Sequence, residues 1–166
     1  MNNLKIISIK KSSTIFLQFV VVTQGIVTFA LLLWEPQIEG VAAHSTNFEL
    51  YFNPFILLVY TGSIPFFAAL FQTFKILRYA ADNNIISPET VKAIRTIKYC
   101  AITIIGFVVL EVIFILLNHG DDDATGGVFI GLLIFAGSGI IASIARMFEK
   151  TLQSAVDIKS ENDLTV

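Results

Sequence analysis

Four long apolar runs dominate the pattern of hydrophobic and polar positions along the chain. They cover residues 13–34, 54–74, 99–117 and 126–145, and each is close to the roughly 20 helical residues that span the ~30 Å hydrocarbon core of a bilayer. None alternates polar and apolar residues, as a strand of an outer-membrane barrel would. The pattern predicts an all-α integral membrane protein, with residues 1–166 forming a single domain built as a bundle of four transmembrane helices.

The composition agrees with this prediction. Of the 166 residues, 55% are hydrophobic and only 14% are charged, whereas about a quarter are charged in a typical soluble domain. A net charge of −2 argues against direct nucleic-acid binding, and the single cysteine, Cys100, excludes an internal disulfide. No common motif of nucleophilic, zinc-dependent or nucleotide-dependent catalysis occurs, so we expect neither enzyme activity nor a cofactor.

Basic residues are confined to three segments of the sequence. They are Lys5, Lys10 and Lys11 before the first run, Lys75, Arg78, Lys92, Arg95 and Lys98 around the second connection, and Arg146, Lys150 and Lys159 after the fourth run. The first and third connections contain acids and no basic residue. The positive-inside rule therefore predicts that both termini and the second connection are cytoplasmic, with a cytoplasmic tail over 146–166.

The second connection contains signals for the end of one helix and the start of the next. Asn83-Asn84 is typical of a helix end, and Ser87-Pro88-Glu89 is typical of a helix start. The third helix is therefore expected to begin there and to reach about Leu117, carrying Lys92, Arg95 and Lys98 on its first turns. These cations form either a collar facing lipid headgroups or a docking surface for an anionic lipid or an acidic partner.

Glu111 is the one ionisable residue well inside a predicted span. An intramembrane charge costs at least ~2.5 kcal/mol on insertion scales, so we expect Glu111 to be protonated at neutral pH and hydrogen-bonded to Gln24, Tyr60 or Thr61. Three roles stay open: a structural contact that fixes helix register, a proton- or cation-coupled role in a small oligomeric transporter or channel, and a lipid-facing residue.

The glycines of the fourth run and the acidic residues before it can each be interpreted as structural or as functional features. Gly127, Gly131, Gly137 and Gly139 place small residues along the fourth run, where they pack within the bundle or against a second copy in a homo-oligomer. Asp121 and Asp123 resemble the opening of a calcium loop, but Leu132 occupies the position of the expected glutamate. The acidic hairpin is therefore at most a weak cation site, and we expect no bound metal.

Three segments carry a resemblance to a known family. They are Ser63-Ile-Pro-Phe-Phe and the residues after it, Ile97-Lys-Tyr-Cys-Ala-Ile-Thr-Ile, and the ending from Ala155 to Val166. These segments resemble the YoaS-like family of bacterial membrane proteins, a family whose domain has no known function. The resemblance implies a four-helix protein of the bacterial cytoplasmic membrane and supplies no catalytic residue. Members are often encoded beside a small helix-turn-helix regulator, which implies such a partner by analogy only.

The leading hypothesis is a non-enzymatic membrane protein that contacts lipids and acts as an anchor or sensor for a cytoplasmic helix-turn-helix regulator. Its candidate interaction residues are Lys92, Arg95, Lys98, Ser160, Glu161, Asn162, Asp163 and Leu164. The alternative for the polar ending is a frayed terminus without a defined structure. The alternative function is the small oligomeric transporter or channel component that uses Glu111.

Overall fold

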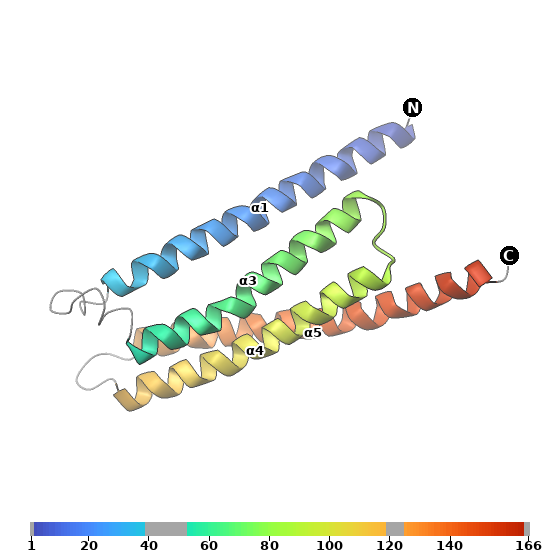
Figure 1. Ribbon diagram of the computed structural model, residues 1–166. Helices are drawn as coiled ribbons and strands as arrows, with labels where there is room; N and C mark the ends of the chain where they lie inside the picture. The colour runs from blue at the N-terminus through green and yellow to red at the C-terminus, as the bar shows by residue number, and fades with distance from the viewer. Residues whose placement is uncertain (1, 39–52, 119–124, 165–166) are drawn as a thin grey trace.

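The computed structural model describes residues 2–38, 53–118 and 125–164, which form long α-helices and the turn between two of them. The helices are α1 (Asn2–Ile38), α3 (Pro54–Ala81), α4 (Pro88–Asn118) and α5 (Thr125–Leu164) (Figure 1). All four are long and apolar enough to cross a membrane, which is consistent with the predicted all-α membrane bundle. Pro65 lies inside α3, which continues on both sides of it.

The turn after α3 follows the sequence signal at Asn83. This residue adopts a left-handed backbone conformation with φ of 55°, which asparagine tolerates better than most residues. The Asn83 N–H donates to the Ala80 carbonyl at 3.3 Å, and the Asn84 N–H donates to the Tyr79 carbonyl at 2.9 Å. These two bonds form a Schellman motif that satisfies the last carbonyls of the helix.

The start of α4 also agrees with the prediction. The Ser87 hydroxyl accepts a hydrogen bond from the Thr90 backbone N–H at 3.3 Å, as an N-cap residue does. Ser87 and Thr90 are both buried, and their hydroxyls lie 3.1 Å apart. The helix then runs without interruption to Asn118, about 46 Å at 1.5 Å per residue.

Each helix packs mainly against its neighbour in the chain. Extensive contacts join α4 to α5 and α3 to α4, and α1 contacts α3 less extensively. Within the described ranges, α1 has no more than marginal contact with α4 or α5. The four helices therefore form an open arrangement in which α1 is peripheral, rather than a bundle closed on every side.

The core is small and consists mainly of small or β-branched residues. Its buried apolar members are Ile56, Val91, Ala93, Ala101, Val108 and Ala145. Many large apolar side chains on all four helices are instead exposed. Because lipid tails are as apolar as these side chains, close packing of small residues, rather than burial of large ones, holds membrane helices together.

Glycines on α5 permit its close approach to α4. A Cβ atom on Gly131 would lie 2.7 Å from Val112 Cγ2, and one on Gly127 would lie 2.9 Å from Ile115 Cδ1. Both distances are shorter than real Cβ contacts, so a side chain at either position would require Val112 or Ile115 to shift. This part of the small-residue pattern therefore packs within the chain, as the intramolecular interpretation expected. At Gly137 and Gly139 an added Cβ would meet no atom within 4 Å.

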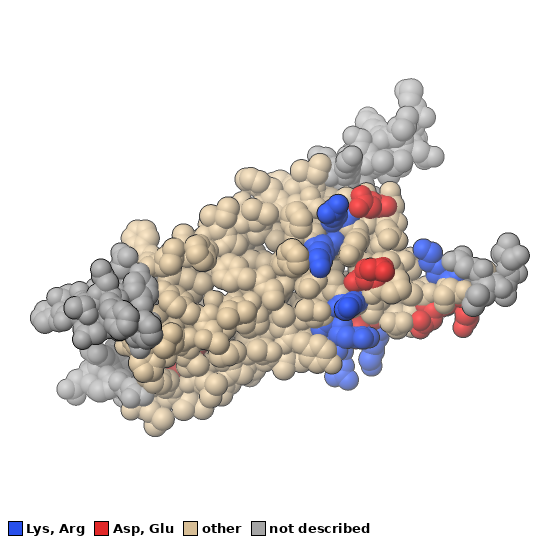
Figure 2. Space-filling model, viewed as in Figure 1, with Lys and Arg blue, Asp and Glu red and all other residues tan. Residues whose placement is uncertain are grey.

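Among the residues that the structure describes, the basic side chains lie toward one end of the molecule. The start of α1, the α3–α4 connection and the end of α5 lie at this end (Figure 1). Figure 2 shows the basic side chains gathered in a band near the same end, next to a long uncharged surface. We call the basic residues on the last turns of α3, the first turns of α4 and the adjoining part of α5 the basic belt: Lys75, Arg78, Lys92, Arg95, Lys98, Arg146 and Lys150.

The helix α5 continues past the basic belt. Its 40 residues extend about 60 Å, roughly twice the hydrocarbon thickness of a bilayer. The frayed ending suggested by the polar composition is therefore wrong up to Leu164, since Ser160 to Leu164 belong to the helix. In Figure 1 the end of α5 projects beyond the start of α4.

Candidate functional site

Glu149 on α5 joins two of the predicted interaction residues on α4. Its Oε1 accepts a hydrogen bond from Arg95 Nε and its Oε2 accepts one from Lys98 Nζ, both at 2.6 Å. The Glu149 side chain is only 14% exposed, whereas Arg95 is 51% exposed. The three residues thus form an ion-pair cluster between neighbouring helices at the level of the basic belt.

The charges of the cluster stabilise one another. Hydrogen bonds from Lys98 and then Arg95 hold the pKa of the Glu149 carboxyl below its usual value, and the hydrogen bond to Glu149 raises the pKa of Arg95. The Lys98 ammonium also lies 4.7 Å from the centre of the Tyr99 ring, a favourable cation–π distance. Arg95 and Lys98 are therefore engaged inside the fold, while Lys92 is exposed.

We call residues 150–164, the part of α5 beyond Glu149, the α5 extension. Its Leu152, Ala155 and Val156 are half-buried, whereas Ile158 is 60% exposed. The predicted tail residues Ser160, Glu161 and Asn162 are exposed, and Asp163 and Leu164 continue the same helix. The structure therefore places the tail residues on one projecting helix, at the end of the molecule that carries Lys92.

One side-chain pair supports the helical form of the α5 extension. Gln153 Nε2 donates to Asp157 Oδ1 at 2.8 Å, one turn further along the helix. The Ser160 hydroxyl donates to the Asp157 carbonyl, also at 2.8 Å. The Gln153–Asp157 pair is separated by four residues, and such pairs stabilise exposed helices by a few tenths of a kcal/mol.

Glu111 lines a cavity to which all four helices contribute. The cavity has a volume of about 620 Å³ and a mainly aliphatic and aromatic lining. Its polar side chains are Gln24, Thr28, Ser63, Thr73, Glu111 and Ser138. A Cβ atom on Gly62 would lie 3.2 Å from Glu111 Oε1, so this glycine leaves room for the carboxyl group. The structure thus brings Gln24 and Glu111 to one cavity.

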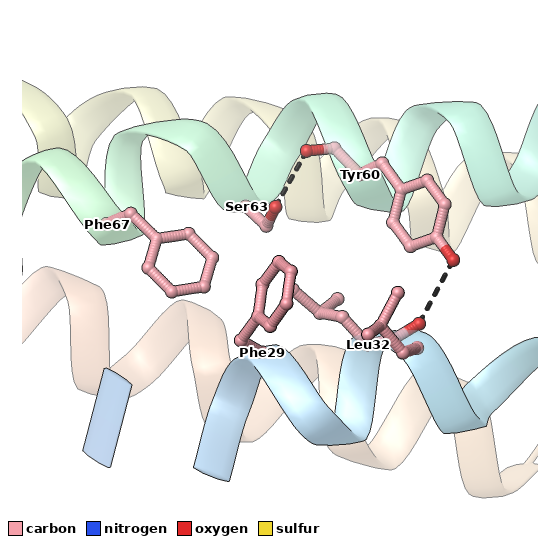
Figure 3. A pocket seen from close by; sticks show the side chains of 6 residues that line it. Phe29, Leu32, Tyr60, Ser63 and Phe67 are labelled. Carbon is pink, nitrogen blue, oxygen red and sulfur yellow. Dashed lines mark hydrogen bonds between the residues drawn. The ribbon is translucent and has the colours of Figure 1, made fainter. Parts of the chain in front are cut away.

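The other two residues of the predicted intramembrane group lie elsewhere on α3. The Tyr60 hydroxyl donates to the Leu32 carbonyl of α1 at 3.1 Å (Figure 3). The Thr61 hydroxyl donates to the Leu57 carbonyl at 2.7 Å, on an exposed side of its own helix. Neither side chain lines the cavity that contains Glu111.

Tyr60 instead borders a second pocket, of about 480 Å³, between α1 and α3. Figure 3 shows the facing Phe29 and Phe67 rings there, whose centres are 6.3 Å apart in a T-shaped arrangement. The Ser63 hydroxyl donates to the Tyr60 carbonyl at 2.7 Å. Because almost every lining group is apolar, this pocket belongs to the packing between α1 and α3.

The described residues offer no metal centre: among them, no group of three His, Cys, Asp or Glu side chains is arranged to hold an ion. The weak candidates Asp121 and Asp123 lie outside the described ranges, so that expectation stays untested. The half-buried Cys100 is a free thiol.

Comparisons with known proteins match most of the chain. The family model described as "Protein of unknown function (DUF2975)" matches residues 37–166. The chain is 39% identical over 158 residues to the uncharacterized membrane protein YoaS of Bacillus subtilis (strain 168), covering 94% of this chain and 99% of that protein. No solved structure matches. These findings confirm the YoaS-like resemblance and a multi-pass membrane protein without known activity: the chain belongs to the DUF2975 family.

Proposed function

We propose that this protein is a non-enzymatic protein of the bacterial cytoplasmic membrane that holds a cytoplasmic regulatory protein through the α5 extension. The observation that carries the proposal is the continuation of α5 as a helix beyond the basic belt. A projecting helix presents side chains in a fixed arrangement, so a partner loses less conformational entropy on binding it than on ordering a flexible tail.

The distribution of charge supports a cytoplasmic position for the extension. Every basic residue from Lys75 to Lys159 lies on the last turns of α3, on the first turns of α4 or in the second half of α5. Such residues favour the cytoplasmic side and attract anionic lipid headgroups. The belt then lies at the inner membrane surface and the extension stands in the cytoplasm.

The basic residues of α4 have different roles in this proposal, because only some of them belong to the ion-pair cluster. Arg95 and Lys98 hold Glu149 and so orient the extension, whereas exposed Lys92 and the extension itself are available to a partner. The partner that the family resemblance favours is a small helix-turn-helix regulator. Retention at the membrane would keep such a regulator away from its DNA sites.

A crosslinking pulldown from native membranes tests the docking role. Full-length protein is compared with a chain that ends at Lys159 and with a chain whose last seven residues are replaced by alanines. A DNA-binding protein recovered only with the native ending supports the proposal. Equal recovery with all three proteins would overturn the proposal. None of the three proteins changes Arg95, Lys98 or Glu149, so the ion-pair cluster is the same in each.

A second function, a small oligomeric transporter or channel component, rests on the cavity that contains Glu111. Intramembrane acids are typical of proton and cation pathways. This function predicts flux of protons or small cations in proteoliposomes that falls at least tenfold in Glu111→Gln. Flux no greater than that of empty liposomes would remove it.

A further inference from the structure

We infer that the cavity around Glu111 binds a lipophilic amine that enters from the membrane. Ligand sites in proteins have volumes of roughly 300–1,000 Å³ and combine an apolar lining with a few polar groups. The cavity, at about 620 Å³, lies inside that range, and aliphatic and aromatic side chains make up most of its wall. The wall therefore suits the hydrocarbon part of such a ligand.

The helix contacts indicate where a ligand enters. All four helices contribute to the cavity wall, and the main contacts join α1 to α3, α3 to α4 and α4 to α5. The remaining boundary lies between α1 and α5, which have at most marginal contact over their described residues. The cavity accordingly opens sideways between these two helices, toward the lipid, and a membrane-dissolved molecule can enter without crossing the aqueous phase.

The polar groups of the wall select an amine. Glu111 is the acid of the lining, and the lining residues include no lysine, arginine or histidine. A neutral amine can take the carboxyl proton of Glu111, so that an ammonium–carboxylate pair forms. The Ser63 and Ser138 hydroxyls and the Gln24 amide oxygen line the same cavity and can accept the remaining N–H bonds that a buried cation needs. An alcohol of equal length cannot accept this proton.

Small residues leave the volume open. Gly137 lines the cavity, and a Cβ atom there would meet nothing within 4 Å. Gly139, two residues later on the same helix, has equal room for a side chain but does not line the cavity. Leucine at the first position would occupy the cavity, whereas leucine at the second would not, so the two glycines form a matched pair.

The test measures binding of nonylamine and of nonanol to the full-length protein in nanodiscs of zwitterionic lipid, with empty nanodiscs as background. The native protein should saturate with nonylamine at an affinity at least tenfold above that for nonanol. Glu111→Gln should lower the nonylamine affinity to that of nonanol. Gly137→Leu should abolish both, and Gly139→Leu should change neither.

Circular dichroism and size-exclusion chromatography establish whether each variant is folded. If Gly137→Leu does not fold, Glu111→Gln still tests the inference independently. Equal affinities for amine and alcohol, unchanged amine binding in Glu111→Gln, or no binding above empty nanodiscs would each overturn the inference. The inference goes beyond the proposed docking role. Loss of partner capture on truncation at Lys159 would leave nonylamine binding unchanged, so the two proposals fail separately.

Discussion

Glu149 shows how one side chain can decide the role of others. Arg95 and Lys98, which sequence reasoning placed on a docking surface, both donate to its carboxylate. The signal available in the sequence was an acid between Arg146 and Lys150, just after the fourth span. That signal could not identify the partners, because they lie 51 and 54 positions away and the register between the two helices decides which of them meet.

Glu149→Gln should loosen the α5 extension. The amide cannot retain two charge-assisted bonds, and partly exposed ion pairs contribute modestly, so backbone amide exchange over 150–164 should accelerate roughly two- to fivefold. Hydrogen exchange read by mass spectrometry measures the change. Asp157→Asn is the matched control, since that acid bonds within its own helix. Equal acceleration in both variants would contradict a role for the cluster.

The lowered pKa of Glu149 predicts a pH dependence. The native state favours the carboxylate, so the stabilisation is complete above the ordinary glutamate pKa of about 4.3 and is lost as the pH falls through the lower native value. Thermal unfolding in detergent from pH 7 to pH 3 should show a steeper loss of Tm for the native protein than for Glu149→Gln. Parallel curves would show that the carboxylate contributes nothing.

At the scale of elements, the close contact between α4 and α5 depends on glycines of α5, which have no side chain. Gly127 and Gly131 face Ile115 and Val112, and the same helix leaves open space beside Gly137 and Gly139. Small-residue spacing in a sequence indicates close approach but does not say to what. Here the first pair packs on α4, and Gly137 opens onto the cavity.

Gly131→Leu should separate α5 from α4. An added Cβ would already lie 2.7 Å from Val112 Cγ2, and overpacking of this kind costs about 1–3 kcal/mol. Unfolding in mixed detergent micelles measures the loss of stability. Gly126→Leu serves as the control because a Cβ there meets nothing within 4 Å. Similar stability of the two variants would argue against the close contact.

For the whole molecule, the decisive prediction is its orientation in the membrane. With Cys100 replaced by alanine, a cysteine introduced as S160C should react with a membrane-impermeant maleimide only after the cells are opened. A cysteine introduced as T125C, at the other end of α5, should react in intact cells. The opposite pattern would place the basic belt outside and remove the basis for a cytoplasmic partner.

The open packing of the four helices explains why the cavity could not be foreseen. Its wall combines side chains from all four helices. Gln24 and Glu111 share the cavity, while Tyr60 bonds to α1 and Thr61 faces outward. The sequence can be used to estimate how deep a residue lies in the membrane. Residues at the same depth can still lie on opposite faces of a helix, so depth alone does not show which of them line the cavity.

The sequence by itself determined the four long apolar helices and the helix boundaries around Asn83 and Ser87. Both depend on local features: the length of each apolar run, and hydrogen bonds within a few residues at the helix ends. Tertiary structure decided what depends on helix register. It paired Glu149 with Arg95 and Lys98, directed Gly131 toward Val112 and placed Glu111 in the wall of a cavity. An apolar face can pack against any other apolar face, so only the assembled helices specify which side chains meet.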